Sequence, residues 1–532
     1  MDNRKYYSFL LFALAFLLFF PGLGARDLWA PVEPRYAEIV RVMFAKGNWI
    51  VPTVNGELYT DKPILYFWVA VVATHLAGGV SEWAVRVPAA LGGIGFVLTS
   101  YIIGRELFGA RVGLIAGVVL ATSFRVIWEA RWAHIDMLFG FFFLLSVYFG
   151  MRALLRRGPP QEVLLSYVFM VLAALAKGLI GVVLPGLLFT AFIVTRRDWQ
   201  LFHRARLPLG VALFLLVATP WFYLVSEATA GQWMRDFIYI HHLQRYTAGT
   251  GHRQPFYYYL TTLPADFMPW TAFAIPALAA YRHYRRAWAE PPVRFCFLWF
   301  LTVFVFFSMS DTKRDLYLLP LLPTLALLVA RYLDDLDRKR LEPSGLYRWL
   351  TTTFFSLIAL SGLALPVAAW FLRPDAMGRL LPSSVVLVCG GSMTVAAVLR
   401  HRTVAALISV STMMLLTVVT AWVWIFPYLE QFKSDRLFSQ EIQRLVPASA
   451  PLYVYADSMN DFNYYTGREV IPVLKTPRVV ARLHEAPQAS YLLIKERDLK
   501  RLPLTEPVTM LARESRGNST WYLLEFGNQS RG

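Results

Sequence analysis

Long apolar stretches alternate with short polar segments along the first four fifths of the chain. Most stretches have roughly 17 to 25 residues, the length that a helix rising 1.5 Å per residue needs to cross about 30 Å of hydrocarbon. The pattern therefore predicts a polytopic α-helical membrane protein with about 13 transmembrane helices. The predicted spans are 6–23, 84–104, 112–127, 135–151, 163–176, 178–195, 207–226, 257–281, 290–309, 315–333, 349–372, 383–399 and 404–427.

Arginine and lysine form short clusters at the ends of these stretches. The positive-inside rule places such clusters in the cytoplasm, together with the N-terminus. They lie at 105–111, 152–157, 196–206, 282–286, 331–340 and 400–402. The loops 26–62, 128–134, 227–256 and 310–314 and the turn at Lys177 are then expected on the opposite, outer side.

One apolar stretch, 64–79, does not fit this alternation. If it crossed the membrane, the next helix would deliver Arg105 and Arg111 to the outer side. We therefore expect 64–79 to lie in the outer interface or to re-enter from it, with Tyr66, Phe67 and Trp68 as aromatic anchors.

The pattern changes near residue 431, where apolar runs shorten to about five residues and alternate with polar ones. Such runs read as strands at 452–456, 490–494 and 520–525, with short helices at 434–445 and 476–484. We predict a transmembrane domain over 1–430, with an outer loop and interfacial helices at 26–83, and a small exported α/β domain over 431–532.

Composition agrees with a membrane protein, since 57% of the residues are hydrophobic and 16% are charged. The net charge of +17 does not indicate nucleic-acid binding, because the cations cap apolar stretches and do not form one basic face or tail. Only two cysteines occur, Cys296 and Cys389, and each lies inside an apolar stretch. A disulfide framework is therefore not expected.

The loop 26–62 holds the densest set of charged side chains, and charge beside lipid is costly unless it is solvated, paired or functional. The outer side also holds His241 and His242. Carboxylates beside histidines can hold a divalent metal ion, and lysine or arginine can bind phosphate. Glu33 and Arg35 could instead form a simple interfacial ion pair, and Asp136 could merely cap its helix.

Several segments resemble one known family. They are 26–38 (Arg-Asp-Leu-Trp-Ala-Pro-Val-Glu-Pro-Arg-Tyr-Ala-Glu), 56–63 (Gly-Glu-Leu-Tyr-Thr-Asp-Lys-Pro), 81–88, 134–137, 242–246 and 255–259. The chain resembles the lipid A aminoarabinose transferases and the wider protein O-mannosyltransferase-like superfamily, which are GT-C membrane glycosyltransferases. The resemblance covers nearly the whole chain.

This resemblance implies an inverting glycosyltransferase that moves a sugar from a polyprenyl-phosphate donor, such as undecaprenyl phosphate, to a lipid A-like or other envelope acceptor. The reaction would occur on the periplasmic face of the bacterial inner membrane, among membrane lipids. The residues that match family contacts to the lipid phosphate are Lys62, Arg245 and Tyr317. Arg35 and Tyr36 belong to the matching first-loop motif and are further candidates for substrate contacts. Lys313, near the outer surface, could bind the acceptor phosphate or, equally well, anionic lipid headgroups. The matching metal positions are Asp61 and His242, with His241 as the alternative, for a divalent ion such as zinc.

Val32 departs from the family pattern, which usually has a catalytic aspartate there. Valine binds neither a proton nor a cation. Three alternatives remain open: Glu33 or Asp136 has the catalytic role, the acceptor is already an anion and needs no base, or the chain is weakened or inactive. Outside catalysis, the rival interpretations are a transporter or flippase for a lipid-linked substrate and a homologue that binds the carrier without transferring the sugar.

Overall fold

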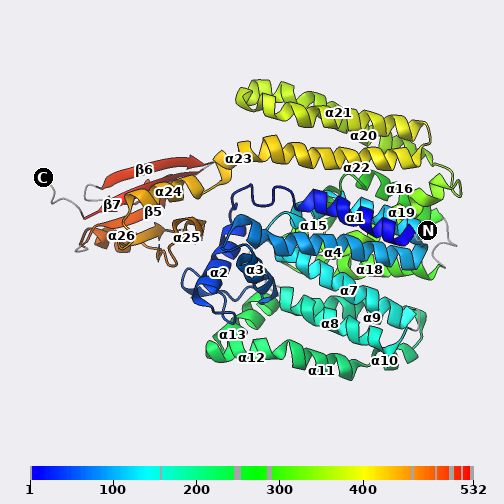
Figure 1. Ribbon diagram of the computed structural model, residues 1–532, viewed down its shortest axis with the longest axis horizontal. Coiled ribbons are helices and arrows are strands. Elements are labelled where there is room, and N and C mark those ends of the chain that lie inside the picture. The colour runs from blue at the N-terminus through cyan, green and yellow to red at the C-terminus, as the bar shows by residue number, and fades with distance from the viewer. Residues whose placement is uncertain are drawn as a thin grey trace. The chain divides into compact units, whose positions relative to one another are not determined.

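The computed structural model describes residues 3–155, 158–244, 253–283, 290–456, 461–485, 488–502, 508–516 and 519–527. Within these residues the chain forms two compact units (Figure 1). The first unit comprises 1–23, 60–69 and 86–425, and the second comprises 24–59, 70–85 and 426–532. The second unit therefore joins most of the predicted outer loop to the C-terminal α/β segment, two parts of the chain that are about 350 residues apart.

The first unit consists of helices, in agreement with the predicted fold class. Nine helices of the described chain are long and apolar enough to cross a membrane, or ten if one bent pair counts as a single span. Shorter apolar helices of 10–17 residues also occur, so the predicted number of 13 stays a prediction. The principal helices are α1 (Asn3–Phe19), α4 (Glu82–Phe108), α5 (Ala110–Ala121), α7 (Ile135–Leu155), α8 (Pro160–Lys177), α9 (Ile180–Arg196), α11 (Leu207–Val217), α12 (Thr219–Ala228), α18 (Pro291–Ser308), α19 (Leu322–Asp337), α20 (Gly345–Leu372), α21 (Met377–Leu399) and α22 (Thr403–Thr420).

The predicted span 112–127 is a bent pair, α5 and α6 (Phe124–Ala130), whose axes differ by 66°. At the bend, the hydroxyl of Thr122 donates to the carbonyl of Val118 at 2.7 Å, and that of Ser123 donates to Val119 at 2.7 Å. Side chains that bond back to the preceding turn compete with the backbone ladder and bend helices. The bend directs α6 and its charged side chains away from the axis of α5.

The prediction of one continuous span over 257–281 was wrong. The structure has two helices there, α15 (Tyr258–Asp266) and α16 (Thr271–His283). Pro269 lies in the break, where it cannot donate a backbone hydrogen bond, and it disfavours helical geometry in the residue before it. The break brings Asp266 to the end of a helix, where its side chain takes part in a cluster of charges described below.

The segment 64–79 contains α3 (Leu65–Leu76), which has 12 residues. At 1.5 Å per residue such a helix is about 18 Å long, shorter than the hydrocarbon core. Its length argues against a crossing, as the charge alternation does, and its place in the interface stays a prediction.

The C-terminal part of the second unit contains a mixed five-stranded sheet of order β4-β3-β5-β7-β6. The strands are β3 (Leu452–Tyr455), β4 (Val473–Leu474), β5 (Ser490–Lys495), β6 (Thr509–Arg516) and β7 (Ser519–Phe526). β3 runs parallel to β4 and β5, whereas β7 runs antiparallel to β5 and β6. The predicted strands correspond to β3, β5 and β7, while β4 and β6 were missed.

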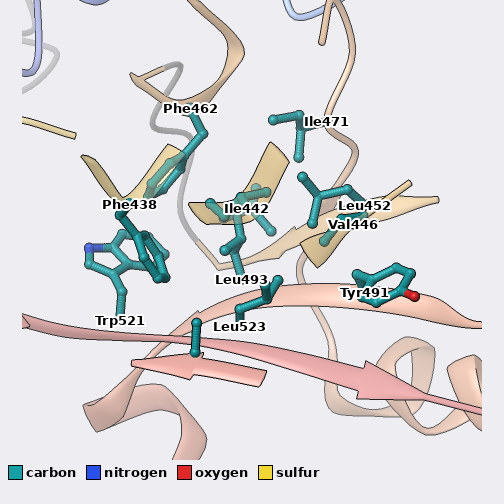
Figure 2. Close-up of a cluster of buried hydrophobic side chains, with 12 residues drawn as sticks. Phe438, Ile442, Val446, Leu452, Phe462, Ile471, Tyr491, Leu493, Trp521 and Leu523 are labelled. Carbon is teal, nitrogen blue, oxygen red and sulfur yellow. The ribbon is translucent and has the colours of Figure 1, made fainter. Parts of the chain in front are cut away.

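Both faces of this sheet are covered, which explains the continuous apolar sequence of its central strand β5. Successive side chains point to opposite faces, so Leu493 contributes to one core and Leu492 to the other. Figure 2 shows the first core, in which Phe438 and Ile442 of α24 (Arg436–Leu445) and Phe462 of α25 (Asp461–Thr466) lie over the sheet. The α/β character predicted for this segment is confirmed.

Candidate active site

A buried ion pair lies where α7 begins and α8 ends. The Nζ of Lys177, in the last turn of α8, is 2.5 Å from Oδ1 of Asp136, in the first turn of α7. The two side chains are 7% and 13% exposed. An anion at a helix N-terminus and a cation at a C-terminus each face the favourable end of the helix dipole. The dipoles of α7 and α8 therefore stabilise the carboxylate of Asp136 and the ammonium group of Lys177 where the two side chains meet.

Two aromatic rings complete the surroundings of Lys177. Its Nζ lies 4.9 Å from the ring centres of Phe139 and Tyr317. Tyr317 belongs to the 3-10 helix η2 (Asp315–Leu321), and its ring packs against Phe307 at 5.3 Å. The structure therefore brings together two of the predicted site residues, Asp136 and Tyr317, around Lys177, which we expected in an outer turn with a structural or carrier-headgroup role.

Lys313, predicted to contact substrate, is directed into the protein. It is 4% exposed, and its ammonium group donates to the carbonyls of Ser310 at 2.5 Å and Gln254 at 3.1 Å. Burial lowers the pKa of Lys313 below its usual value. These contacts hold the turn between α18 and η2, and contact between Lys313 and a substrate stays a prediction.

A second group of buried charges joins α6, α15 and η2, and the sequence analysis missed it. The guanidinium of Arg125 donates to Asp266 at 2.6 and 2.9 Å and to Glu129 at 3.2 Å, and it also pairs with Asp315. The other oxygen of Glu129 lies 2.6 Å from Nδ1 of His134. Arg125 and Glu129 are four residues apart on one helix, a spacing that could have indicated the pair.

This second cluster positions the residues around the first ion pair. His134 stands two residues before Asp136, and Asp315 stands two residues before Tyr317. The charges of Arg125 and its partners therefore fasten the two segments that carry Asp136 and Tyr317. Because one buried arginine bonds several carboxylates, we assign this cluster a structural role.

The predicted metal residues also meet in the first unit. Oδ1 of Asp61 and Nδ1 of His241 are 2.5 Å apart, with side chains 24% and 17% exposed. The other ring nitrogen of His241 lies 3.2 Å from the hydroxyl of Thr60. Lys62, the next residue after Asp61, is half-buried and donates to the carbonyl of Asp61 at 3.1 Å.

These two side chains have the right chemistry for a divalent metal ion. Carboxylate oxygen and imidazole nitrogen are zinc ligands, and the second ring nitrogen of a zinc-bound histidine almost always has a hydrogen-bond partner, a place that the hydroxyl of Thr60 takes here. Two ligands of one tetrahedral zinc ion stand about 3.3 Å apart, so the pair would have to separate slightly. No group of three or more potential ligands occurs among the described residues. Metal binding stays a prediction.

Two predicted residues cannot be placed. Arg245 lies outside the described residues. His242 belongs to the π-helix η1 (Tyr239–Gln244), but its side chain also lies outside the described part. Of the two histidines, the structure thus gives partners only for His241.

Glu33 begins α2 (Glu33–Lys46) in the second unit and is completely buried. Its Oε2 accepts from Nη2 of Arg26 at 2.7 Å and from the backbone N–H of Trp29 at 3.1 Å. The ion pair considered with Arg35 does not form, since the partner of Glu33 is Arg26. These contacts give Glu33 a structural role, and a catalytic role stays a prediction.

The remaining residues predicted in this loop lie on the same helix. Arg35 is half-buried, and none of the described carboxylates pairs with it. Tyr36 is 6% exposed and meets Tyr59 edge-to-face at 6.3 Å. Val32 precedes the helix and makes no side-chain capping bond. Val32 therefore cannot take the role of the aspartate that the family pattern has at this position.

Within the second unit, the outer loop is fixed to the C-terminal segment by hydrogen bonds. Arg436 and Ser434 donate to the two oxygens of Asp27 at 2.8 and 2.6 Å. The backbone N–H of Leu28 donates to the hydroxyl of Tyr465 at 2.7 Å. The segment that precedes Glu33 is therefore fixed to the C-terminal part of the unit, and we assign this part a role in positioning the loop.

Comparison with known proteins agrees with these observations. A family model described as dolichyl-phosphate-mannose-protein mannosyltransferase matches residues 61–224. The undecaprenyl phosphate-alpha-4-amino-4-deoxy-L-arabinose arabinosyl transferase of Shewanella sediminis is 28% identical, covering 88% of this chain and 86% of its own length. The protein of the same description from Pseudomonas aeruginosa strain LESB58 is 31% identical, covering 68% and 66%.

Solved structures show the same fold. ArnT from Cupriavidus metallidurans bound to undecaprenyl phosphate superposes with a TM-score of 0.79 over 100% of both chains, at 24% identity. The archaeal oligosaccharyltransferase AglB from Archaeoglobus fulgidus has a TM-score of 0.50 and 13% identity, covering 93% of this chain and 70% of its own. This chain belongs to the GT-C membrane glycosyltransferases, and among them it resembles the undecaprenyl-phosphate aminoarabinose transferases.

Proposed function

We propose that this protein transfers a sugar from a polyprenyl-phosphate donor to an envelope acceptor on the periplasmic face of the bacterial inner membrane. The observation that carries the proposal is the buried pair of Lys177 and Asp136 beside Tyr317, at one end of membrane-spanning helices. Buried charge at the end of a span is costly and therefore indicates a working site. The names of the relatives, which include undecaprenyl phosphate and an aminoarabinose, support this class of donor.

In this reaction the bond between the anomeric carbon and the donor phosphate breaks, and the acceptor oxygen forms the new bond to that carbon from the opposite side. The electron pair of the broken bond stays on the phosphate, which leaves as the carrier monoester with additional negative charge. Fixed cations and hydroxyl donors stabilise such developing charge. Lys62, Arg245 and the hydroxyl of Tyr317 are the groups we assign to this task.

The acceptor that best fits the site is itself an anion. Glu33 is bonded to Arg26 and a backbone N–H, and Asp136 is bonded to Lys177. In each case the paired cation favours the ionised form and makes the carboxylate a weaker base, and Val32 offers no alternative. A phosphate oxygen is already ionised at neutral pH and needs no base, unlike a serine hydroxyl. We therefore assign a phosphate-bearing glycolipid of the lipid A type as the acceptor.

Asp61 and His241 are the residues that would hold a divalent ion in this proposal. Such an ion would add positive charge for the leaving phosphate. The protein's own contribution is to place Lys62 directly after Asp61, so that a cationic side chain and the proposed metal ligands share one short segment.

Transfer from a panel of undecaprenyl-phosphate sugars to lipid A, with purified protein in nanodiscs, tests the proposal. Lys62→Ala is expected to lose at least a hundredfold in transfer rate, because removing one charge-stabilising donor typically costs that much. Lys46→Ala is the matched control, since Lys46 is 54% exposed and its partner among the described residues, Glu469, is exposed as well. Tight carrier binding without transfer from any donor would overturn the proposal in favour of a carrier-binding protein.

A further inference from the structure

A cavity of about 150 Å³ lies among α7, α8, α9, α10 (Gln200–Ala205) and α11, away from the candidate active site. Apolar side chains dominate its lining, among them Leu154, Met170, Phe189, Ile193 and Phe202. The cavity reaches Gly150 on α7, which stands 14 residues, or about 21 Å of helix, beyond Asp136. It is thus a separate feature at the opposite membrane face.

Three hydroxyl-bearing side chains line the cavity, Ser166, Tyr167 and Thr190, and the first two are bonded within the protein. The hydroxyl of Ser166 donates to the carbonyl of Ser146 at 2.8 Å, and that of Tyr167 donates to the carbonyl of Ala205 at 2.8 Å. A buried water needs two to four polar partners, and an apolar cavity of this size stays dry and takes up hydrocarbon groups. The suitable occupant is therefore a segment of hydrocarbon.

The rim of the cavity is strongly basic. Residues 196–206 contain four arginines, Arg196, Arg197, Arg204 and Arg206, and one acidic residue, Asp198. All four arginines are exposed, and none forms an ion pair with a described carboxylate. The chain between them supplies Phe202 and Ala205 to the cavity lining. The same short segment thus presents cations outward and apolar surface inward.

The same segment carries an exposed aromatic side chain. Arg197 and Arg206 end α9 and α10 in the left-handed conformation that is common at helix C-termini, with φ values of 55° and 49°. Between them, Trp199 is 59% exposed and stacks on Phe202. Exposed tryptophan is typical of the level of lipid headgroups.

We propose that this cavity and its basic rim bind one anionic phospholipid of the cytoplasmic leaflet. Part of an acyl chain occupies the cavity between α8 and α9, and the headgroup phosphate contacts Arg204 and Arg206. Charge complementarity decides the class of lipid, because a cluster of exposed arginines at the membrane surface attracts anionic headgroups. The site would hold the inner ends of α7 and α8, whose outer ends carry Asp136 and Lys177.

Two variants separate the cavity from the rim. A Cβ added at Gly186 on α9 meets nothing within 4 Å, so Gly186→Leu fills the cavity without a clash and improves helix propensity. Arg204→Gln with Arg206→Gln removes the headgroup contacts. Gly378→Leu on α21, where an added Cβ also meets nothing, and Arg400→Gln with Arg402→Gln in another basic cluster are the matched controls.

The experiment titrates delipidated full-length protein in detergent with dioleoyl phosphatidylglycerol or dioleoyl phosphatidylcholine. Native mass spectrometry counts bound lipid, and thermal unfolding measures stabilisation. We expect one phosphatidylglycerol to bind and stabilise the wild type and both controls. Binding should weaken roughly tenfold or more in the double arginine variant, since each cation near an anionic headgroup contributes appreciably. Gly186→Leu should lose the bound lipid while remaining folded.

Equal binding of the two lipids by the wild type would overturn the proposal, because the basic rim would then have no role. Unchanged binding of phosphatidylglycerol in Gly186→Leu would also overturn it, since the cavity would not hold the chain. A loss of binding that is as large in the Arg400 and Arg402 control would show only general attraction to anionic lipid.

Discussion

Breaking the buried pair of Lys177 and Asp136 should destabilise the helical unit, and neutralising both residues should restore most of the loss. Removing one partner of a buried ion pair typically costs about 3–5 kcal/mol, because the other charge is left without compensation. We expect the lower end for both Lys177→Met and Asp136→Asn, because each remaining charge still faces a helix end of opposite sign. About 3 kcal/mol corresponds to a change of roughly a hundredfold in the folded-to-unfolded ratio.

The two single variants should not be equal. When Asp136 is replaced, the ammonium of Lys177 keeps the faces of Phe139 and Tyr317 at 4.9 Å, and a desolvated cation–π contact contributes about 1 kcal/mol or more. When Lys177 is replaced, Asp136 loses its bonded cation and keeps only the weaker electrostatic contributions of His134 and Arg314. Lys177→Met should therefore be the more damaging change by about 1 kcal/mol.

The assay is thermal unfolding in detergent at one heating rate, which allows comparison even when unfolding is irreversible. A loss of 3 kcal/mol should lower the midpoint by roughly 4 °C for a unit of several hundred residues. Arg331→Gln is the control, since Arg331 is 22% exposed and its partner Asp335 keeps a second arginine, Arg340. A double variant as unstable as the two single changes added together would refute the coupling between Lys177 and Asp136.

Three further predictions concern the other charged groups. If Asp61 and His241 hold a divalent ion, elemental analysis of the purified wild type should find about one bound metal ion per chain, and the control His75→Ala should contain the same amount. Asp61→Ala or His241→Ala should lower the bound metal content at least tenfold. Equal metal content in all four proteins would exclude the site. Glu33→Gln removes the buried anion that lies 2.7 Å from the guanidinium of Arg26, so the second unit should lose about 3 kcal/mol and become sensitive to limited proteolysis. Lys46→Gln, at an exposed pair, should not have this effect. Burial, together with the nearby carboxylate of Glu441, raises the pKa of Glu514 to about 7. Since this pKa exceeds the value in the unfolded chain, the contribution of Glu514 to stability is complete below about pH 4.5 and is lost as the pH rises through about 7. The loss is at most about 3 kcal/mol. The unfolding midpoint of Glu514→Gln should therefore vary less with pH across this window than that of the wild type.

The helical unit was largely predictable because a single physical requirement, the thickness of the bilayer, sets the length of each apolar stretch. The errors arose where a short local signal interrupted an apolar stretch. Pro269 ends one helix before α16 begins, and the hydroxyls of Thr122 and Ser123 bend another. Both signals are present in the sequence, but hydropathy averaged over a span hides them.

The C-terminal sheet shows the same limit at smaller scale. β5 was predictable because a strand covered on both faces is apolar throughout. β6 was missed because Arg513, Glu514 and Arg516 make it look like a loop, although charged side chains are common on the edge strand of a sheet. Its pairing with β7 also shifts register between Met510 and Ala512, which interrupts the alternation that would have revealed it.

The candidate site was predictable in its ingredients but not in its pairings. The sequence places Asp136 at the start of a helix, where capping and catalysis were equally good interpretations. The structure shows that its carboxylate pairs with Lys177, 41 residues away, an interaction that depends on α7 and α8 being antiparallel neighbours. In the same way Glu33, expected beside Arg35, pairs with Arg26, because the loop before α2 turns back on itself. The partner of a buried charge decides whether it can act as a base, so the chemistry of this site depends on contacts that no local pattern contains.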